Sequence, residues 1–415
     1  MNQTKSFNDI NLKLCAFCGT CIGICPENAI VPGERKPVLA GSCKACGICF
    51  DNCPGKGFPI EKMNQRLFGT TGVDREIGYY RSIYVGCSSN PAVRNNGASG
   101  GVVTALLLNL MERKAVDGAI VVGMDEAEPW KAKAKILYGR EEVVKAAQSK
   151  YTLLPLNAAL KEVGNSKDAF ALVGLPCHIH GLRLLQFNGW KPVDQIKYFL
   201  GLFCGFNMEA AATDFLIKKA GLKKEEIASL AYRSGDWPGG LLIKGKNGRE
   251  VFIPKRHYNY LNLQYVPSRC LLCPDLTNEF ADISVGDAWE KGSDRRGGWS
   301  RIIVRSDQGS DLLKTAVISG DLQVETSSKE ALLKSSGHLV RHKKIGFFTR
   351  IKLATQSPAF DLKSPDLTLR EKMAGVIFYG SILFFRNKWM KGLIGLLPVE
   401  FAGKIFGLAA GGKRK

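Results

Sequence analysis

Eight cysteines near the N-terminus follow one spacing twice. Each copy has three cysteines separated by two residues, a fourth after three more residues, and then a proline. The copies are Cys15-x2-Cys18-x2-Cys21-x3-Cys25-Pro26 and Cys43-x2-Cys46-x2-Cys49-x3-Cys53-Pro54. Three thiolates at this spacing can cover one face of a [4Fe–4S] cubane. Zinc sites and disulfides also use cysteine pairs, but zinc rarely takes a third thiol at this spacing.

The repeat therefore predicts two [4Fe–4S] clusters and a role in electron transfer. In two-cluster ferredoxins the fourth cysteine of each copy serves the other cluster. The first set of ligands is thus Cys15, Cys18, Cys21 and Cys53. The second set is Cys25, Cys43, Cys46 and Cys49.

Four more cysteines form a third set: Cys177, Cys204, Cys270 and Cys273. Two of them follow expected strands, where α/β proteins tend to build sites. The other two form Cys-x2-Cys followed by a proline. Four thiols suffice for a third cluster, but spacing alone leaves zinc or redox-active thiols equally open. The remaining cysteine, Cys87, is interpreted as a core or surface thiol.

A glycine-rich loop, Ser99-Gly100-Gly101, precedes an expected helix at 102–113. Such a loop offers backbone N–H groups and the positive helix end to an anion. The pyrophosphate of a flavin dinucleotide would fit there. The alternative is a simple turn, because many glycine loops before helices bind nothing.

Composition narrows the class of protein and its surroundings. The chain has 415 residues, 13 cysteines and a net charge of +20. No nucleic-acid recognition motif accompanies the charge, so acidic redox partners, anionic cofactors, anionic lipid or a dispersed basic surface are the interpretations. Free thiols favour a reducing compartment, the cytoplasm, and the first 30 residues lack a secretory pattern.

The pattern of apolar residues predicts a mixed α/β fold behind a small cysteine-rich domain. Strands are expected at 82–85, 118–123, 169–173 and 196–203, an antiparallel insertion at 227–255, and a strand–helix–strand unit at 300–325. Asn207 is expected to cap the helix after the fourth strand. The expected divisions are a ferredoxin-type domain at 1–70, a flavin-loop region at 78–160, a third-cluster region at 161–345 and a basic, apolar helical tail at 346–415.

The tail carries two apolar stretches, at 373–385 and 389–410. The first has 13 uncharged residues, too few to span a bilayer. Seven basic residues and one acid lie between 386 and 415. This pattern favours amphipathic helices lying in a membrane interface. The alternative is a helical pair docked on the protein or on a partner subunit.

Several motifs occur in an order typical of one family. They are Gly97-Ala-Ser-Gly-Gly-Val-Val-Thr-Ala-Leu106, Ser149-Lys-Tyr151, Gly174-Leu-Pro-Cys177 with Gly181-Leu-Arg183, Cys270-x2-Cys273, and Ala281-Asp-Ile-Ser-Val-Gly-Asp-Ala-Trp289. The chain resembles the beta subunit of coenzyme F420-reducing hydrogenase and the related formate and F420H2 dehydrogenase subunits over about residues 78–330. The domain in front looks like that of the longer family members.

The resemblance implies an oxidoreductase that binds FAD and a third [4Fe–4S] cluster held by the third set. It implies FAD contacts at Ser99, Gly100 and Gly101, with Ser149 and Lys150 as further candidates. Asp287 has no assigned chemistry beyond anchoring a loop, and no catalytic residue is assigned. A redox partner protein, either a ferredoxin or a hydrogenase or dehydrogenase subunit, is expected.

The expected function is an iron–sulfur flavoprotein that passes electrons between clusters and FAD, and hydride between FAD and an organic acceptor such as coenzyme F420. The alternatives are a ferredoxin-dependent reductase in a tetrapyrrole or cell-surface polysaccharide pathway, and an electron-relay subunit of a larger complex. The expected location is the cytoplasm or the inner face of the cell membrane, where the tail would lie.

Overall fold

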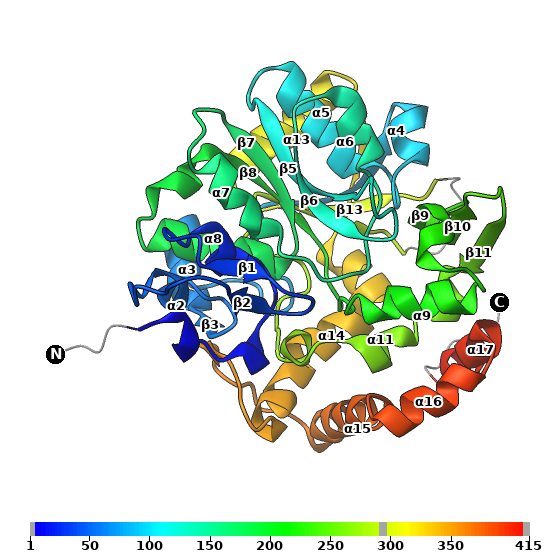
Figure 1. Cartoon of the computed structure of the whole chain (residues 1–415). Coiled ribbons are helices and arrows are strands. Elements are labelled where there is room, and N and C mark those ends of the chain that lie inside the picture. Colours follow the sequence, from blue (N-terminus) through cyan, green and yellow to red (C-terminus); the bar gives the residue numbers. More distant parts are fainter. Residues whose placement is uncertain (1–4, 290–296, 410–415) are drawn as a thin grey trace.

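An eight-stranded mixed sheet forms the centre of the molecule (Figure 1). The computed structural model describes residues 5–289 and 297–409. In spatial order the strands are β14 (Leu322–Thr326), β4 (Ser82–Ser88), β13 (Ser300–Val304), β12 (Ile283–Asp287), β8 (Ile196–Leu202), β7 (Phe170–Gly174), β5 (Gly118–Met124) and β6 (Ala132–Leu137). The predicted mixed α/β class is confirmed, and the expected strands match these positions closely.

Five strands of this sheet run in the same direction. β5, β7, β8 and β12 pair in parallel, with Ile120 opposite Leu172 and Leu200 opposite Ile283. β4 is antiparallel to β13, which is antiparallel to β12, so β4 joins this direction. The carboxyl ends of all five strands therefore lie at one edge of the sheet, where α/β folds place ligands.

Helices cover both faces of the sheet. One core contains α5 (Val102–Glu112), α6 (Arg140–Lys145) and α13 (Asp307–Ile318). The other contains α3 (Ile60–Phe68), α7 (Leu160–Val163), α8 (Pro176–Phe187) and η3 (Leu156–Ala159). Buried on both faces, the inner strands are rich in Val, Ile and Leu, as parallel strands require. The smaller helices α4 (Pro91–Asn95), η4 (Lys191–Gln195) and η5 (Lys224–Glu226) lie in connections.

The N-terminal cysteine domain reproduces its sequence repeat in the backbone. Its elements are η1 (Phe7–Asp9), η2 (Leu12–Leu14), α1 (Thr20–Gly23), β1 (Ile30–Pro32), β2 (Pro37–Leu39), α2 (Ile48–Asp51) and β3 (Gly57–Phe58). The short helices α1 and α2 are offset by 28 residues. Each begins after a glycine in the left-handed region, Gly19 with φ +87° and Gly47 with φ +76°. The two copies thus share one local fold.

A late segment of the chain ties this domain to the rest. β15 (Ala359–Phe360) pairs in parallel with β3. The Asp361 carboxylate accepts hydrogen bonds from the backbone N–H groups of Glu61 and Lys62 at the start of α3. A side chain at Gly57 would lie 2.0 Å from the Ala359 carbonyl oxygen, so only glycine allows this pairing.

The expected antiparallel insertion is present as a three-stranded sheet. Its strands are β9 (Ile227–Ser234), β10 (Gly240–Gly245) and β11 (Glu250–Pro254), followed by α10 (Lys255–Tyr258), α11 (Leu261–Tyr265) and α12 (Ser268–Leu271). The expected cap at Asn207 is wrong, because α9 (Ala211–Lys219) begins four residues later. The Asn207 amide instead donates to the Thr152 carbonyl, which ties two loops together.

Four helices close the described part of the chain: α14 (Lys329–Leu353), α15 (Leu369–Phe385), α16 (Lys388–Leu396) and α17 (Val399–Ala409). The last three run along one side of the molecule toward the insertion sheet (Figure 1). Met390, Ile394, Val399 and Ala402 pack into the core of that insertion. Within the described residues, no helix has both the length and the apolar character needed to cross a bilayer. Residues 410–415 of the expected tail lie outside the described residues.

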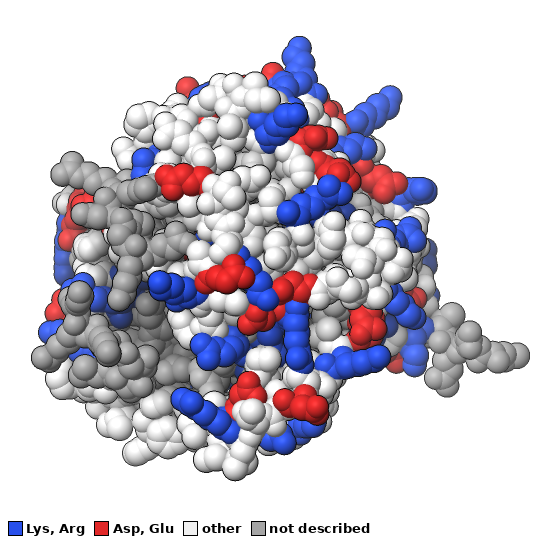
Figure 2. All heavy atoms as spheres, turned by 180° about the vertical axis from the view of Figure 1, so that it is seen from behind, with Lys and Arg blue, Asp and Glu red and all other residues white. Residues whose placement is uncertain are grey.

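Charged residues are interspersed on the surface. Seen from behind in Figure 2, the acidic side chains lie among the basic ones over the described face. This arrangement fits the expected dispersed basic surface on that face.

Candidate functional site

The first and second sets of cysteines each line a cavity. One cavity is bordered by Cys15, Cys18, Cys21 and Cys53. The other is bordered by Cys25, Cys43, Cys46 and Cys49. The structure therefore groups the eight thiols as the ferredoxin spacing predicts, with the fourth cysteine of each copy crossing to the other cavity.

The electrostatics of these thiols suit a site for a metal cluster. Burial is the main cause that raises the pKa of Cys15 to about 12 and that of Cys18 to about 11, and the nearby Cys53 contributes to both. Burial likewise raises the pKa of Cys49 to about 12, with Cys46, Cys43 and Cys25 adding to it. Thiols that oppose one another's ionisation are stabilised as thiolates once a metal binds.

A cubane suits these cavities better than a single ion. Among the described residues, no three His, Cys, Asp or Glu side chains converge on one ion position. A [4Fe–4S] cluster instead takes one thiolate at each of four separate irons, so its ligands need not converge. The donor sets fit this group, and its presence stays a prediction.

The third set comes together from three separate segments. Cys177 lies in the first turn of α8, and Cys204 follows β8. Cys270 lies in α12, with Cys273 just beyond it. Burial raises the pKa of Cys177 well above its usual value, and Cys18, Cys270, Cys204 and Cys273 raise it further. All four thiols are therefore electrostatic neighbours.

A buried lysine accompanies the third set. Lys343 of α14 is 2% exposed and lies over the ring of Phe206. Burial raises the pKa of Cys204 to about 12, while Lys343 opposes the rise. It opposes the rise at Cys270 in the same way. A cation here favours additional negative charge at the third set.

The three sets form a row. Cys49 of the second set is an electrostatic neighbour of Cys21 in the first set. Cys18 of the first set is a neighbour of Cys177 in the third. The first set therefore lies between the other two. Cys46 of the second set is exposed to solvent, so this end of the row opens to the surface.

Two buried side chains bridge the first and third sets. The Asn157 amide donates to Thr20 Oγ1 and to the His178 carbonyl, both at 2.9 Å. The Arg269 guanidinium donates to the carbonyls of Pro54 and Leu272 at 2.9 and 2.8 Å. These bonds fix the distance between the loops that carry the two sets.

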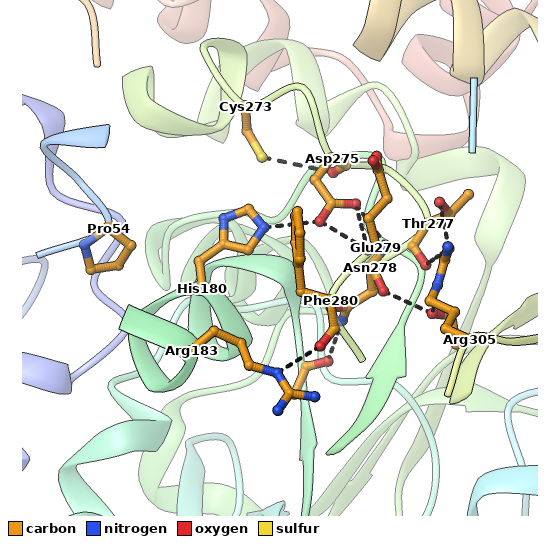
Figure 3. A network of polar contacts seen from close by, with 12 residues as sticks. Pro54, His180, Arg183, Cys273, Asp275, Thr277, Asn278, Glu279, Phe280 and Arg305 are labelled. Atoms are coloured by element: carbon orange, nitrogen blue, oxygen red, sulfur yellow. Dashed lines mark hydrogen bonds and ion pairs between the residues drawn. The ribbon is translucent and has the colours of Figure 1, made fainter. Parts of the chain in front are cut away.

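A buried polar network anchors the loop after Cys273 (Figure 3). The Asp275 carboxylate accepts from the backbone N–H groups of Asn278 and Glu279 and lies 3.0 Å from His180 Nε2. The Cys273 thiol lies 3.7 Å from the Asp275 carbonyl. Burial would raise the pKa of Asp275, but His180 and the nearby cations outweigh it and lower the pKa.

The same network reaches the cysteine domain and the sheet. The His180 ring stacks on Phe58, with 4.1 Å between the ring centroids. Lys344 pairs with the Glu279 carboxylate, and the Arg305 guanidinium donates to both oxygens of Thr277. Both histidines near Cys177 are thus engaged in structure, because His178 Nδ1 accepts from the Leu175 N–H at the start of α8.

The glycine-rich loop lies at the carboxyl edge of the sheet, next to β13. Ser99 is buried, and its hydroxyl lies 2.8 Å from Ser300 Oγ. The Gly100 N–H donates to Ser300 Oγ at 3.0 Å. Gly101, with φ +72°, begins α5 without a capping side chain. The first turn of α5 is buried and has no capping side chain on its positive end.

Arg233 joins this loop to two other predicted motifs. It lies on β9, and its guanidinium donates to the Ala98 carbonyl at 2.6 Å, to the Tyr151 hydroxyl at 2.9 Å and to Asp287 at 3.1 Å. Burial opposes its charge, but Tyr151 and Asp287 outweigh burial and raise the pKa of Arg233. Asp287 therefore orients Arg233. Sequence reasoning missed Arg233, since a lone arginine in an alternating strand carries no signal.

The other two predicted flavin contacts lie near this loop. Ser149 and Lys150 precede Tyr151. The Lys150 ammonium donates to the carbonyls of Ala146 and Ala147 after α6. Burial lowers the pKa of Lys150 to about 7. Its ammonium is thus occupied in the structure, and its contact with a flavin stays a prediction.

Unpaired buried donors lie on residues that contact the glycine loop or the neighbouring Gly298. In the described part of the chain, Arg94 Nε, Arg233 Nε and Trp237 Nε1 are buried without a hydrogen-bond partner. Buried donors of this kind usually have a partner. Their number near one loop fits a polar ligand such as a flavin dinucleotide.

Comparisons with known proteins agree with these features. Residues 83–161 match the N-terminal model, and residues 167–330 the C-terminal model, of the family described as "Coenzyme F420 hydrogenase/dehydrogenase, beta subunit". The chain is 32% identical to the coenzyme F420-dependent sulfite reductase of Methanocaldococcus jannaschii, over 80% of this chain and 51% of the relative. It thus spans about half of that relative's length.

Two further relatives extend the comparison. One F(420)H(2) dehydrogenase component of Methanosarcina mazei is 25% identical, over 81% of this chain and 91% of that one. A chain of the F420-reducing [NiFe] hydrogenase complex from Methanosarcina barkeri shares the fold, with a TM-score of 0.55 and 21% identity over 71% of this chain and 99% of that one.

Fold and matches together define an α/β protein whose named relatives are components of oxidoreductases. The chain belongs to the family of coenzyme F420 hydrogenase/dehydrogenase beta subunits. The resemblance inferred from the motifs is thereby confirmed.

Proposed function

We propose that the protein is an iron–sulfur flavoprotein that exchanges electrons with a partner protein and hydride with coenzyme F420. The observation that carries this proposal is the row of three cysteine sets, which has an exposed end at Cys46. The names of the relatives support coenzyme F420 as the hydride partner.

Different residues of the chain have different roles in this proposal. The three sets would hold [4Fe–4S] clusters, which carry single electrons, and the glycine loop would hold FAD, which exchanges them for hydride. Asn157 and Arg269 keep the first and third sets at a fixed separation. Arg233 holds the glycine loop and Tyr151 in place, next to the uncapped start of α5. Ser99, Gly100, Gly101, Ser149 and Lys150 remain proposed neighbours of the flavin.

A redox partner would dock at the second set. Cys46 is exposed, and the cavity it lines is bordered by apolar residues such as Leu39 and Ile48. Relatives named as parts of hydrogenases and dehydrogenases support a partner protein. The thirteen cysteines favour a reducing compartment, so we place the protein in the cytoplasm.

The C-terminal helices would bind the inner face of an anionic membrane. Of the nineteen exposed large apolar side chains among the described residues, eleven lie on these helices: Leu369, Met373, Val376, Ile377, Leu383, Phe384, Trp389, Leu393, Leu396, Phe401 and Ile405. The same helices carry six basic and two acidic residues between 369 and 405. Exposed apolar side chains among basic ones suit a membrane interface.

Anaerobic purification followed by titration tests the redox proposal. We expect about twelve irons, as much sulfide and one FAD per chain. The flavin should bleach when reduced coenzyme F420 is added. A chain that holds iron but no flavin would show an electron relay instead. Intact cofactors that do not respond to coenzyme F420 would move the search to other acceptors.

Arg233→Met tests the flavin site separately. This variant should lose most of its FAD and keep its iron, because Arg233 contacts only the glycine-loop side of the molecule. Arg249→Met, which alters a guanidinium bonded to Ala220 and Gly221, is the matched control. Equal FAD content in both variants would remove the proposed flavin site.

Vesicle binding tests the membrane proposal. Ile377 and Leu396 are 66% and 80% exposed, so changing either to glutamate should weaken binding to phosphatidylglycerol vesicles without unfolding the chain. Ile318→Glu, at a 74% exposed site on α13, should leave binding intact. If neither tail variant weakens binding, a protein partner covers these helices instead.

A further inference from the structure

A cavity of about 400 Å³ lies between the cysteine domain, α12 and α15. Its lining includes Cys15 of the first set, Arg269 beside the third set, and Arg386 at the end of α15. A volume of this size suits a small organic molecule. The glycine loop and Arg233 do not line it, so it is separate from the proposed flavin site.

The cavity carries excess positive charge. Five basic and two acidic side chains line it: Lys13, Arg35, Lys36, Arg269, Arg386, Glu34 and Glu209. Arg35 pairs with Glu209, which leaves Arg386 without a carboxylate partner among the described residues. Arg386 donates to Ser268 Oγ, at 3.1 Å.

The cations in this region repel one another and lower one another's pKa. Burial lowers the pKa of Arg386, and the charge of Arg35 lowers it further. Burial, Arg386 and Arg35 lower the pKa of the neighbouring Lys391 as well. An anion placed among these groups would relieve the repulsion.

Arg269 is the most buried cation of the lining. It is 4% exposed, and two of its nitrogens are bonded to backbone carbonyls. Its Nε has no hydrogen-bond partner among the described residues. Arg269 therefore adds positive charge to the wall of the cavity, while its hydrogen bonds hold the backbone in place.

Apart from Ser268, Thr355 and Gln356, the rest of the lining is largely apolar. Leu14, Phe17, Leu272 and Leu383 come from the cysteine domain, the end of α12 and α15. Tyr379 adds a ring with a polar tip. A ligand for this cavity therefore combines an anionic group with an apolar body.

We propose that this cavity binds an organic phosphate, with the phosphate held by Arg386 among the other cations of the lining and the apolar body against Phe17 and Leu383. Guanidinium groups match phosphate oxygens in geometry and charge. The ligand would lie beside Cys15, so it would bear on electron passage through the first set. That last consequence rests on the proposed function, whereas binding itself does not.

Calorimetry on the full-length, anaerobically purified protein tests the proposal. Phenyl phosphate is the probe, and inorganic phosphate and benzyl alcohol represent its two parts. Phenyl phosphate should bind more tightly than either part. Arg386→Gln should weaken its binding at least about tenfold, the effect of losing one charge-assisted hydrogen bond. Arg249→Gln, outside the cavity lining, should leave the affinity unchanged.

A second variant and a second measurement keep the proposal testable if Arg386→Gln fails to fold. Arg35 is exposed, so Arg35→Gln should fold normally and also weaken binding, because Glu209 would then add its negative charge to the cavity. Phenyl phosphate should alter the electron paramagnetic resonance signal of the reduced first cluster. Iron and FAD content should be the same in all variants. Affinity that is unchanged by both Arg386→Gln and Arg35→Gln, or no binding to the unaltered protein at millimolar probe, would overturn the proposal.

Discussion

The two halves of the cysteine repeat have the same local fold and opposite surroundings. Residues 28 positions apart share their backbone geometry: Phe17 and Ala45 both have φ near +50°, and Gly19 and Gly47 both precede a four-residue helix. The first half packs against η3, where a side chain at Gly19 would lie 2.5 Å from the Pro155 carbonyl oxygen. Gly47 has no such neighbour, and Cys46 is exposed.

The difference shows what a duplicated motif needs in order to become part of a larger enzyme. Spacing alone gives each half its helix and its thiols. Both halves have a glycine before the helix, but only in the first half do glycines, Gly19 and Gly23, lie directly against the backbone of residues 155–158. At the position equivalent to Gly23 the second half has Asp51, which is exposed. One half thus faces inward and the other faces solvent.

The largest effect is expected from a change in the buried network that anchors the loop after Cys273. Asp275→Ala takes a buried acceptor away from His180 and from two backbone N–H groups and leaves nearby cations uncompensated. We expect a loss of about 3–5 kcal/mol in unfolding free energy, the usual effect of breaking a buried ion pair. Iron from the third set should fall while the second set keeps its own. Glu250→Ala, which breaks an exposed pair with Lys244, is the control and should change little.

The next test compares the two glycines directly. Gly19→Ala and Gly47→Ala share the strain of a left-handed residue, roughly 1–2 kcal/mol. Only Gly19→Ala also collides with the Pro155 backbone, so it should cost about 1–3 kcal/mol more. Chemical denaturation of the holoprotein measures both. Equal losses would mean that the inward packing of the first half does not contribute to stability.

A smaller effect is expected at the bridge between the first and third sets. Asn157→Ala removes the hydrogen bonds to Thr20 Oγ1 and the His178 carbonyl, at a cost of roughly 1–2 kcal/mol. Rapid mixing should also show slower electron passage from the first to the third cluster. The exposed Asn165, bonded to the Lys161 carbonyl, supplies the control variant Asn165→Ala. Unchanged passage in Asn157→Ala would mean that the bridge has no part in electron transfer.

The smallest effect is expected when a chelator is added to the unaltered protein and the loss of iron is followed. Cys46 is exposed, whereas its counterpart in the first half, Cys18, is 8% exposed. The second cluster should therefore lose its iron first, in a phase of about four irons. Resonance spectra recorded during the loss identify the cluster. Simultaneous release from both halves would contradict the contrast between them.

The sequence predicted most of the sheet, and the three cysteine sets it singled out are each brought together in the structure, while their role as cluster ligands stays a prediction. Apolar runs such as the one at β5 sufficed for the strands, and the repeat sufficed for the first two sets because their ligands are close in the chain. Asn207 was misplaced as a helix cap, because its amide is used in a contact with the Thr152 carbonyl that local patterns do not encode.

The features that the sequence did not predict depend on contacts between residues far apart in the chain. Arg233 reaches Ala98 across 135 residues, and Arg269 reaches Pro54 across 215 residues. No spacing rule connects such residues in a single sequence. The cavity beside Cys15 was equally hidden, since its lining comes from both ends of the chain.

The pairing of β3 with β15 determines the order in which contacts of the cysteine domain can form during synthesis. Gly57 and Phe58 leave the ribosome early, but their strand partner and the Asp361 carboxylate that caps α3 are among the later residues to be made. The cysteine domain must therefore wait for about 300 residues before its last contacts can form. Contacts within the cysteine domain can form first, and the clamp made by β15 and Asp361 closes last.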